Sequence, residues 1–181
     1  MQTRTPQLLV LPGIYNSDAD HWQTRWEAIF PNATRVQQRD WDHPSCTEWV
    51  ATLEQAVQQQ TQPVILVAHS LGCLTVAHWS AQTQQHLQGA LLVSVPDPQG
   101  TNFPKDAKGY EQTPMQPLPF KSIIVCSTND PYGSAAYMQH CAQAWGSELA
   151  VIGDYGHINA SSGLGAWEQG QTLLAKLMQA A

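Results

Sequence analysis

The chain of 181 residues has few positive charges and no long apolar run, and both shortages exclude classes of function. Eight lysines and arginines stand against fourteen acidic residues, which leaves a net charge of −6. A nucleic-acid-binding protein needs a basic face that neutralises phosphates, and so few dispersed cations cannot form one. Anionic membrane surfaces are disfavoured for the same reason, and no run approaches the roughly 18 apolar residues of a membrane-spanning helix. We therefore expect neither nucleic-acid nor membrane partners.

Cysteine is also scarce. Cys46, Cys73, Cys126 and Cys141 stand far apart and form no C-x-x-C pair, which argues against a zinc site or a disulfide framework and favours reduced, mostly buried thiols. The histidines show no metal-ligand spacing with a carboxylate, so the sequence predicts no metal and no other cofactor. The early run "LLVL" has about half the length of a signal-peptide apolar region, and we expect a cytoplasmic protein.

What is present is an alternation of short aliphatic runs with longer amphipathic ones. It predicts a single domain over residues 1–181 with α/β architecture: a mostly parallel sheet of about six strands, helices on both faces and no large lid domain. Strands are expected at 7–13, 34–40, 63–69, 89–96, 122–128 and 148–153, and helices at 20–30, 46–60, 71–82, 134–145 and from about 165. The Pro-rich segment 97–120 is long for a connection, so we expect a functional loop.

The segment "VILVAHSLGCLTVAHW" (64–79) places a serine directly between a buried strand and a helix. A nucleophilic serine needs such an abrupt turn, with small residues two positions before and after it. Ala68 and Gly72 occupy those positions around Ser70; the usual pattern has glycine at both. The following helix would also direct its N-terminal dipole towards negative charge that develops at the serine. The segment predicts that Ser70 is a nucleophile.

A nucleophilic serine needs a histidine base and an acid that orients it, and in this topology both follow later strands. Asp130 comes after the strand at 122–128, and His157 comes after the strand at 148–153. The two side chains should therefore lie at the same edge of the sheet as Ser70. Asp97, after the strand at 89–96, is the alternative acid. His69 adjoins Ser70 but should turn away from it, so a packing or hydrogen-bonding role is expected.

Two further parts of the site can be assigned to loops. The oxyanion of the reaction should accept hydrogen bonds from the backbone N–H of Leu71 and from Ile14 or Tyr15, in the loop after the first strand. Phe103, Tyr110, Met115 and Phe120, in the long loop, are candidates for an apolar substrate wall. Their alternative role is to anchor that loop against the core.

Several blocks of the sequence together resemble one protein family. They are "PGIYNSDADHWQTRWE", "DWDHPSCTEWVATL", "VAHSLG", "STNDPY" and "GHINASSGLGAWEQG". In this order they resemble the small serine hydrolases similar to retinoblastoma-binding protein 9 and the bacterial YdeN-like proteins. The resemblance implies a compact three-layer α/β-hydrolase fold, and a triad that maps onto Ser70, Asp130 and His157. Segment 97–120 matches no block of the family.

The sequence thus predicts a cofactor-independent serine hydrolase that cleaves a small carboxylic ester or an amide through an acyl-enzyme intermediate. The alternative is a protein-binding module that keeps the hydrolase fold with little or no activity. Exposed tryptophans would favour that alternative, and the chain has seven tryptophans, most of which should be buried.

Overall fold

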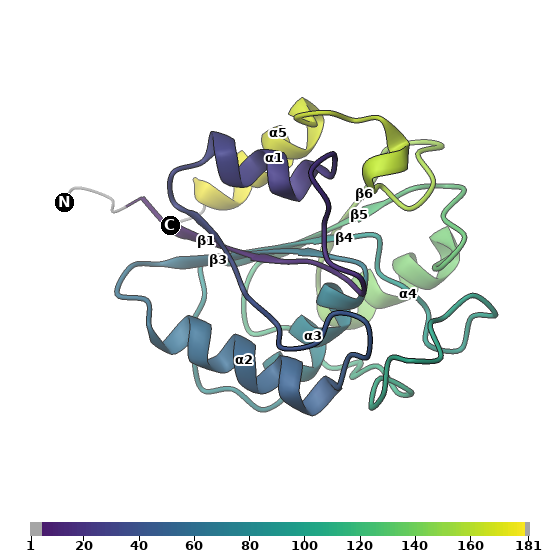
Figure 1. The fold of residues 1–181 in the computed structure, drawn as a ribbon, viewed down its shortest axis with the longest axis horizontal. Coiled ribbons are helices and arrows are strands. Elements are labelled where there is room, and N and C mark those ends of the chain that lie inside the picture. The colour runs from purple at the N-terminus through teal and green to yellow at the C-terminus, as the bar shows by residue number, and fades with distance from the viewer. Residues whose placement is uncertain (1–4, 180–181) are drawn as a thin grey trace.

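Six parallel strands pair into one sheet in the computed structural model of the protein, which describes residues 5–179 (Figure 1). The strands are β1 (Gln7–Leu11), β2 (Ala33–Arg35), β3 (Val64–His69), β4 (Gly89–Val93), β5 (Ser122–Cys126) and β6 (Glu148–Val151). The helices are α1 (Trp22–Ile29), α2 (Cys46–Gln58), α3 (Leu71–Ser80), α4 (Ala135–Trp145) and α5 (Glu168–Met178), with a short 3-10 helix at Ala160–Ser162.

The strands lie in the order β2-β1-β3-β4-β5-β6. The chain first moves outward from β1 to β2, then crosses to β3 on the other side of β1, so the direction of winding reverses between β1 and β3. In open α/β sheets, ligands bind beyond the carboxyl ends of the strands at such a switch point. The fold therefore places the loops after β1 and β3 where a site is expected.

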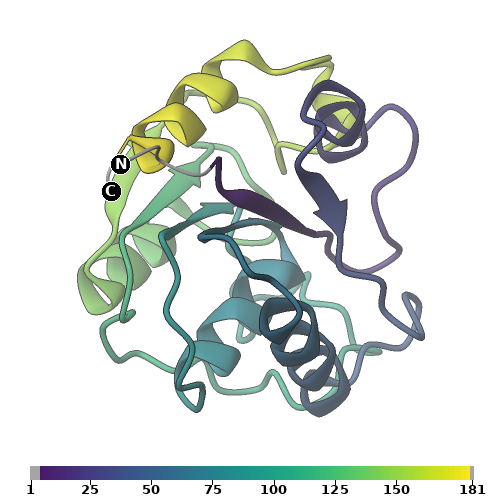
Figure 2. The ribbon, with the colours of Figure 1, turned by 90° about the vertical axis from the view of Figure 1, so that its left-hand side faces the viewer.

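Helices cover both faces of the sheet, and each face has its own core. Figures 1 and 2 show α1 and α5 on one face and α2, α3 and α4 on the other. The aliphatic residues of the strands alternate between these two cores, which explains why β3, β4 and β5 are buried along their whole length.

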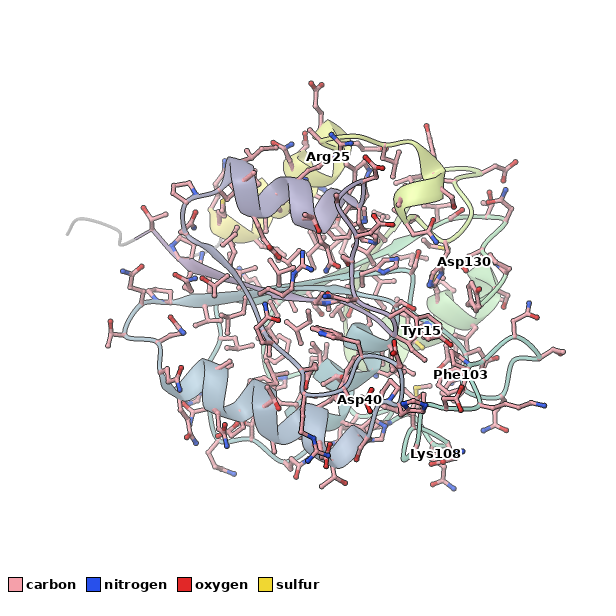
Figure 3. The ribbon with its side chains drawn as sticks, in the orientation of Figure 1. Tyr15, Arg25, Asp40, Phe103, Lys108 and Asp130 are labelled. Carbon is pink, nitrogen blue, oxygen red and sulfur yellow. The ribbon has the colours of Figure 1, made fainter. Side chains whose placement is uncertain are left out.

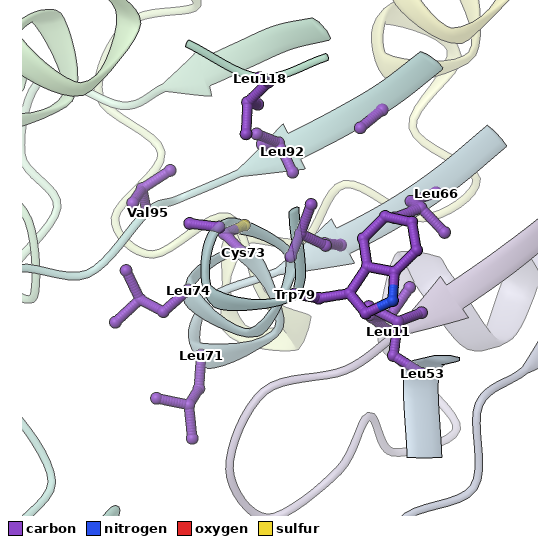
Figure 4. Close-up of a cluster of buried hydrophobic side chains, with 14 of the residues drawn as sticks. Leu11, Leu53, Leu66, Leu71, Cys73, Leu74, Trp79, Leu92, Val95 and Leu118 are labelled. Carbon is purple, nitrogen blue, oxygen red and sulfur yellow. The ribbon is translucent and has the colours of Figure 1, made fainter. Parts of the chain in front are cut away.

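Helix α3 is the most deeply buried helix of the chain that the structure describes. Eight of its ten residues are buried, as expected of a helix that is apolar on every side. Figure 4 shows its side chains within the larger core, where Leu74 and Trp79 lie among residues from the strands and from α2. This packing fixes the position of the helix that begins immediately after Ser70.

The predicted element types are all confirmed, whereas most boundaries differ by one to a few residues, and three of these differences have a clear cause in the backbone. The second strand ends at Arg35 instead of residue 40, because this edge strand pairs only with three residues of β1. β4 ends at Val93 because Ser94 adopts a φ of 56°, which breaks the extended conformation. The last helix begins at Glu168, after Trp167 with a φ of 47°. Segment 97–120 is irregular, as expected.

All four cysteines are buried and unpaired, as the sequence predicts. None of the helices within residues 5–179 is both long and apolar enough to cross a membrane.

Candidate active site

Ser70 occupies the turn between β3 and α3, with a φ of 54° and a ψ of −125°. A non-glycine residue rarely adopts a positive φ, and such strain is often held at functional sites. Gly72 allows the turn to pack against β1, because a Cβ at this position would lie 2.4 Å from the carbonyl oxygen of Leu11. At Ala68, the position that departs from the usual glycine, the small side chain is fully buried without disturbing β3.

The side chains of Ser70, His157 and Asp130 form one hydrogen-bonded chain. The Nε2 of His157 lies 2.8 Å from the Oγ of Ser70, and its Nδ1 lies 2.9 Å from both carboxylate oxygens of Asp130. The Asp130 side chain is fully buried, and its Oδ1 also accepts from the backbone N–H of Tyr132 at 2.9 Å. Because ionised Asp130 only accepts, Nδ1 carries the imidazole proton, and the bare Nε2 can accept the hydroxyl proton of Ser70.

Hydrogen bonds between two loops hold His157 at its distance from Asp130. The Oδ1 of Asn129 accepts from the backbone N–H of Gly156 at 2.7 Å and from the hydroxyl of Ser127. Ser127 in turn accepts from the backbone N–H of Tyr155 at 2.9 Å. The loop after β5 thus positions the loop after β6. Sequence reasoning missed this role of Asn129, although the residue stands directly before Asp130.

Two tryptophans of α1 support the segment that follows His157. The indole N–H of Trp22 donates to the carbonyl of Ile158, and that of Trp26 donates to the carbonyl of Ala166, both at 2.8 Å. Both indoles also contact the ring of Trp167. The sequence blocks "HWQTRWE" and "GHINASSGLG" are therefore in direct contact. This contact gives a structural reason why both blocks occur in the same sequence.

The structure favours Asp130 over Asp97 as the acid beside His157. The carboxylate of Asp97 accepts from the backbone N–H of Gln99 at 2.9 Å and shapes its own turn.

His69 turns away from the hydroxyl of Ser70, as expected, and its Nε2 lies 2.8 Å from the carbonyl oxygen of His157. Burial lowers the pKa of His69 well below its ordinary value, so the ring is neutral and donates this hydrogen bond.

The loop after β1 approaches Ser70 closely because residue 13 is glycine. A Cβ on Gly13 would lie 2.8 Å from the Cβ of Ser70 and 3.3 Å from the backbone nitrogen of Leu71. The backbone N–H groups of Leu71 and Ile14 have no acceptor within residues 5–179. The N–H of Tyr15, in contrast, donates to the carbonyl of Trp41 at 2.9 Å. Of the two expected alternatives the structure thus favours Ile14, and Tyr15 is not available as an oxyanion donor.

Two polar side chains that the sequence analysis missed, one buried and one partly buried, hold this loop. The amide nitrogen of Gln23 donates to the carbonyls of Leu11 and Val67, and Gln23 is completely buried. The guanidinium of Arg35 donates to the side chain of Asn16 and to the carbonyl of Ser17. No local pattern identifies these residues, since each acts through carbonyls that are distant in the sequence.

A pocket of about 400 Å³ opens beside Ser70 and His157. Phe103 lines it, as predicted, and Figure 3 shows Phe103 at the same end of the molecule as Tyr15 and Asp130. The other three predicted wall residues do not line it, and Phe120 packs instead against the core. Tyr110 is completely buried and shares a hydrogen bond of 2.8 Å with Thr75, so it anchors the loop to α3. Met115 is exposed and lies outside the pocket lining.

Other residues complete the lining of this pocket. The ring of Tyr132 contacts that of His157, with 4.5 Å between their centres. The remaining lining includes Ile14, Leu71, Pro96 and Pro104, with His21 and His69 as buried polar members. No group of three or more histidine, cysteine or acidic side chains within residues 5–179 could hold a metal ion.

Comparisons with known proteins extend over the whole fold. A YdeN-like hydrolase of Pectobacterium atrosepticum is 35% identical, with a TM-score of 0.86 over 97% of this chain and 92% of that one. The ydeN gene product of B. subtilis is 18% identical, with a TM-score of 0.76 over 96% and 98% of the two chains. An esterase of Thermogutta terrifontis shares the fold at 14% identity, with a TM-score of 0.69 over 97% and 90%.

The expected α/β-hydrolase fold and the resemblance to YdeN-like proteins are thereby confirmed, while the likeness to retinoblastoma-binding protein 9 stays a prediction. A search among curated protein sequences finds no match. The sequence model described as serine hydrolase matches residues 8–176. With nearly all of its length matched, the chain belongs to the serine hydrolase family.

Proposed function

We propose that the protein hydrolyses a small carboxylic ester, or an amide, with Ser70 as nucleophile, His157 as base and Asp130 as the acid that orients it. The observation that carries the proposal is the hydrogen-bonded chain from the Oγ of Ser70 through both nitrogens of His157 to Asp130, at the wall of a pocket. Nucleophile, base and orienting acid in this geometry are what acyl transfer requires.

In the first half of the reaction, the Nε2 of His157 takes the hydroxyl proton while the Oγ of Ser70 bonds to the acyl carbon. The carbonyl π electrons move to oxygen, and the oxyanion accepts hydrogen bonds from the N–H groups of Leu71 and Ile14. Asp130 stabilises the imidazolium. The tetrahedral intermediate then collapses: the bond to the leaving oxygen or nitrogen breaks, and that atom takes the proton from His157.

In the second half, water attacks the acyl-enzyme and gives its proton to His157. The new tetrahedral intermediate breaks its bond to the Oγ of Ser70, which recovers the proton from His157, and the carboxylic acid leaves. The enzyme returns to its starting state, so the cycle consumes only substrate and water.

The pocket supports a small substrate without negative charge. Its volume of about 400 Å³ lies near the lower end of the range for small-molecule sites. The lining contains aliphatic, aromatic and polar side chains and the carboxylate of Asp18, but no lysine or arginine that would pair with an anionic group. The acyl and leaving groups are therefore expected to be short and to carry no negative charge.

The rival proposal, a protein-binding module, loses the observation that would favour it. Six of the seven tryptophans are at most 3% exposed: Trp22, Trp26, Trp49, Trp79, Trp145 and Trp167. Trp41 is partly buried and packs against the larger core. Among the residues that the structure describes, no tryptophan is fully exposed, and Trp41 is the one tryptophan that keeps partial exposure.

Labelling with a fluorophosphonate, followed by intact-mass analysis, tests the proposal. The wild type should gain one adduct, Ser70→Ala none, and His157→Ala should react much more slowly because the serine loses its base. Ser161→Ala is the matched control: Ser161 lines the same pocket but bonds to Asn159 instead of a histidine, so this variant should keep the adduct. A folded wild type that stays unlabelled would overturn the proposal.

A further inference from the structure

His21 lines the pocket beside Ser70 and has one ring nitrogen without a partner. The residue is only 4% exposed. Its Nδ1 accepts from the backbone N–H of Gln23 at 3.2 Å and so caps the start of α1. Its Nε2 is buried and has no hydrogen-bond partner within residues 5–179. Buried polar groups are nearly always paired in native proteins, so this exception requires an explanation.

The bonding of Nδ1 defines the chemical character of the free nitrogen. Because Nδ1 accepts, the proton of a neutral ring must be on Nε2, which is therefore a donor. Burial lowers the pKa of His21 to about 4, so the ring is neutral at pH 7. His21, a residue of the pocket lining, thus has a neutral N–H group, which suits an uncharged acceptor better than an anion that would need a charged partner.

The neighbouring rings do not supply the missing acceptor. His21 meets His69 edge to face, with 4.7 Å between ring centres, and His69 meets His157 at 4.9 Å. These three histidines form a row from the proposed base into the pocket wall. The Nε2 of His69 donates to the carbonyl of His157, and no hydrogen bond joins His69 to the Nε2 of His21. The row therefore ends in the unpaired N–H of His21, one ring removed from His157.

We infer that His21 is a specificity-determining residue, whose Nε2–H donates a hydrogen bond to an uncharged oxygen of the substrate other than the ester carbonyl. The inference rests on the proposed function, since it assumes that the pocket binds the ester. An ether, hydroxyl or further carbonyl oxygen would satisfy this donor, whereas a plain alkyl chain leaves it unpaired. Sites built around a buried donor discriminate against analogues that lack its acceptor.

A series of oxygen-substituted esters tests the inference. In each ester one methylene of a hexanoyl group, or of a hexyl alcohol, is replaced by oxygen, and kcat/KM is divided by that of the unsubstituted hexyl hexanoate. The acyl and alcohol sets distinguish which half of the substrate meets His21. His21→Asn is the test variant, because asparagine keeps the helix cap while its shorter side chain removes the donor. His43→Asn is the matched control, since His43 is exposed and lies outside the pocket lining.

The wild type should prefer at least one oxygen position over the unsubstituted ester, and His21→Asn should lose about 2- to 13-fold of that preference, the range of one neutral hydrogen bond. His43→Asn should keep it. An unchanged preference at every position in His21→Asn, or no preference in the wild type, would overturn the inference even though hydrolysis itself continues.

Binding measured without turnover separates this inference from the proposed function. Calorimetric titration of the same esters into Ser70→Ala and into Ser70→Ala/His21→Asn gives the preference as a ratio of Kd values. If the wild type hydrolyses nothing but the second substitution still removes the binding preference, the proposed function fails and the role of His21 stands. If His21→Asn leaves the Kd ratios unchanged as well, the inference fails.

Discussion

Replacing Gly13 by alanine should remove most of the activity while the protein remains folded. Gly13 does not have a positive φ, so alanine can adopt its backbone conformation. The added methyl group would lie 2.8 Å from the Cβ of Ser70, 3.2 Å from its Oγ and 3.3 Å from the nitrogen of Leu71. A substrate oxyanion must approach that nitrogen to about 2.7–3.1 Å, so methyl group and oxyanion would compete for the same space.

Two effects set the size of the expected loss of activity in Gly13→Ala. Loss of one oxyanion donor costs about 100- to 1,000-fold in kcat, or about 2.7–4 kcal/mol. A displacement of the nucleophile by about 1 Å can cost about 100-fold. Since the methyl group causes at least one of these, we expect kcat/KM for Gly13→Ala to fall by at least about 100-fold. The new methyl group is too close to Ser70, so the surrounding backbone must shift to accommodate it. We expect this shift to lower the free energy of unfolding by about 1–3 kcal/mol.

Gly89→Ala is the matched control for this experiment. A Cβ on Gly89 would lie 3.0 Å from the carbonyl oxygen of Lys121 and 3.1 Å from the Cδ2 of Leu177, at the start of β4 and therefore at the end of that strand away from Ser70. It should lower stability in urea titrations without a comparable loss of kcat/KM per folded molecule. If folded Gly13→Ala keeps kcat/KM within about tenfold of the wild type, the oxyanion site is not at Leu71 and Ile14.

Three further predictions follow from the site. Asp130→Asn should lower kcat by about 10,000-fold, because the amide favours the wrong tautomer of the histidine, whereas Asp97→Asn should stay within about threefold; equal losses in steady-state assays would contradict the choice of acid. Because the folded state holds the pKa of His21 at about 4, below its ordinary value near 6.5, only the unfolded chain binds this proton between those pH values. The free energy of unfolding should therefore fall by about 3 kcal/mol from this residue as pH drops from 6.5 to 4, and urea titrations of His21→Asn should show a correspondingly smaller loss. Phe103→Ala should raise KM about 5- to 10-fold through lost apolar contact, and Met115→Ala should leave KM unchanged; the reverse pattern would mean that the substrate wall is misassigned.

The sequence is sufficient to predict the α/β architecture. It also predicts that a serine, a histidine and an aspartate follow strands that end at the same edge of the sheet. Strands with continuous apolar runs must be covered on both faces, and alternation with helices makes them parallel. The carboxyl ends of these strands then share one edge of the sheet. For this reason the sequence predicts that the side chains of Ser70, Asp130 and His157 lie close together. Some boundaries differ because a single backbone angle, as at Ser94, ends a strand without a local sequence signal.

Which neighbouring groups are free and which are already bonded depends on tertiary contacts. Tyr15 and Ile14 look equivalent in the sequence, but the carbonyl of Trp41 accepts the N–H of Tyr15. Tyr110 looks like Phe103, but Thr75 of α3 holds it in the core. Each outcome depends on a partner more than twenty residues away in the sequence. The local sequence pattern cannot predict such a contact. The unpaired nitrogen of His21 belongs to the same class, because an absent partner is visible only when the whole surrounding fold is in place.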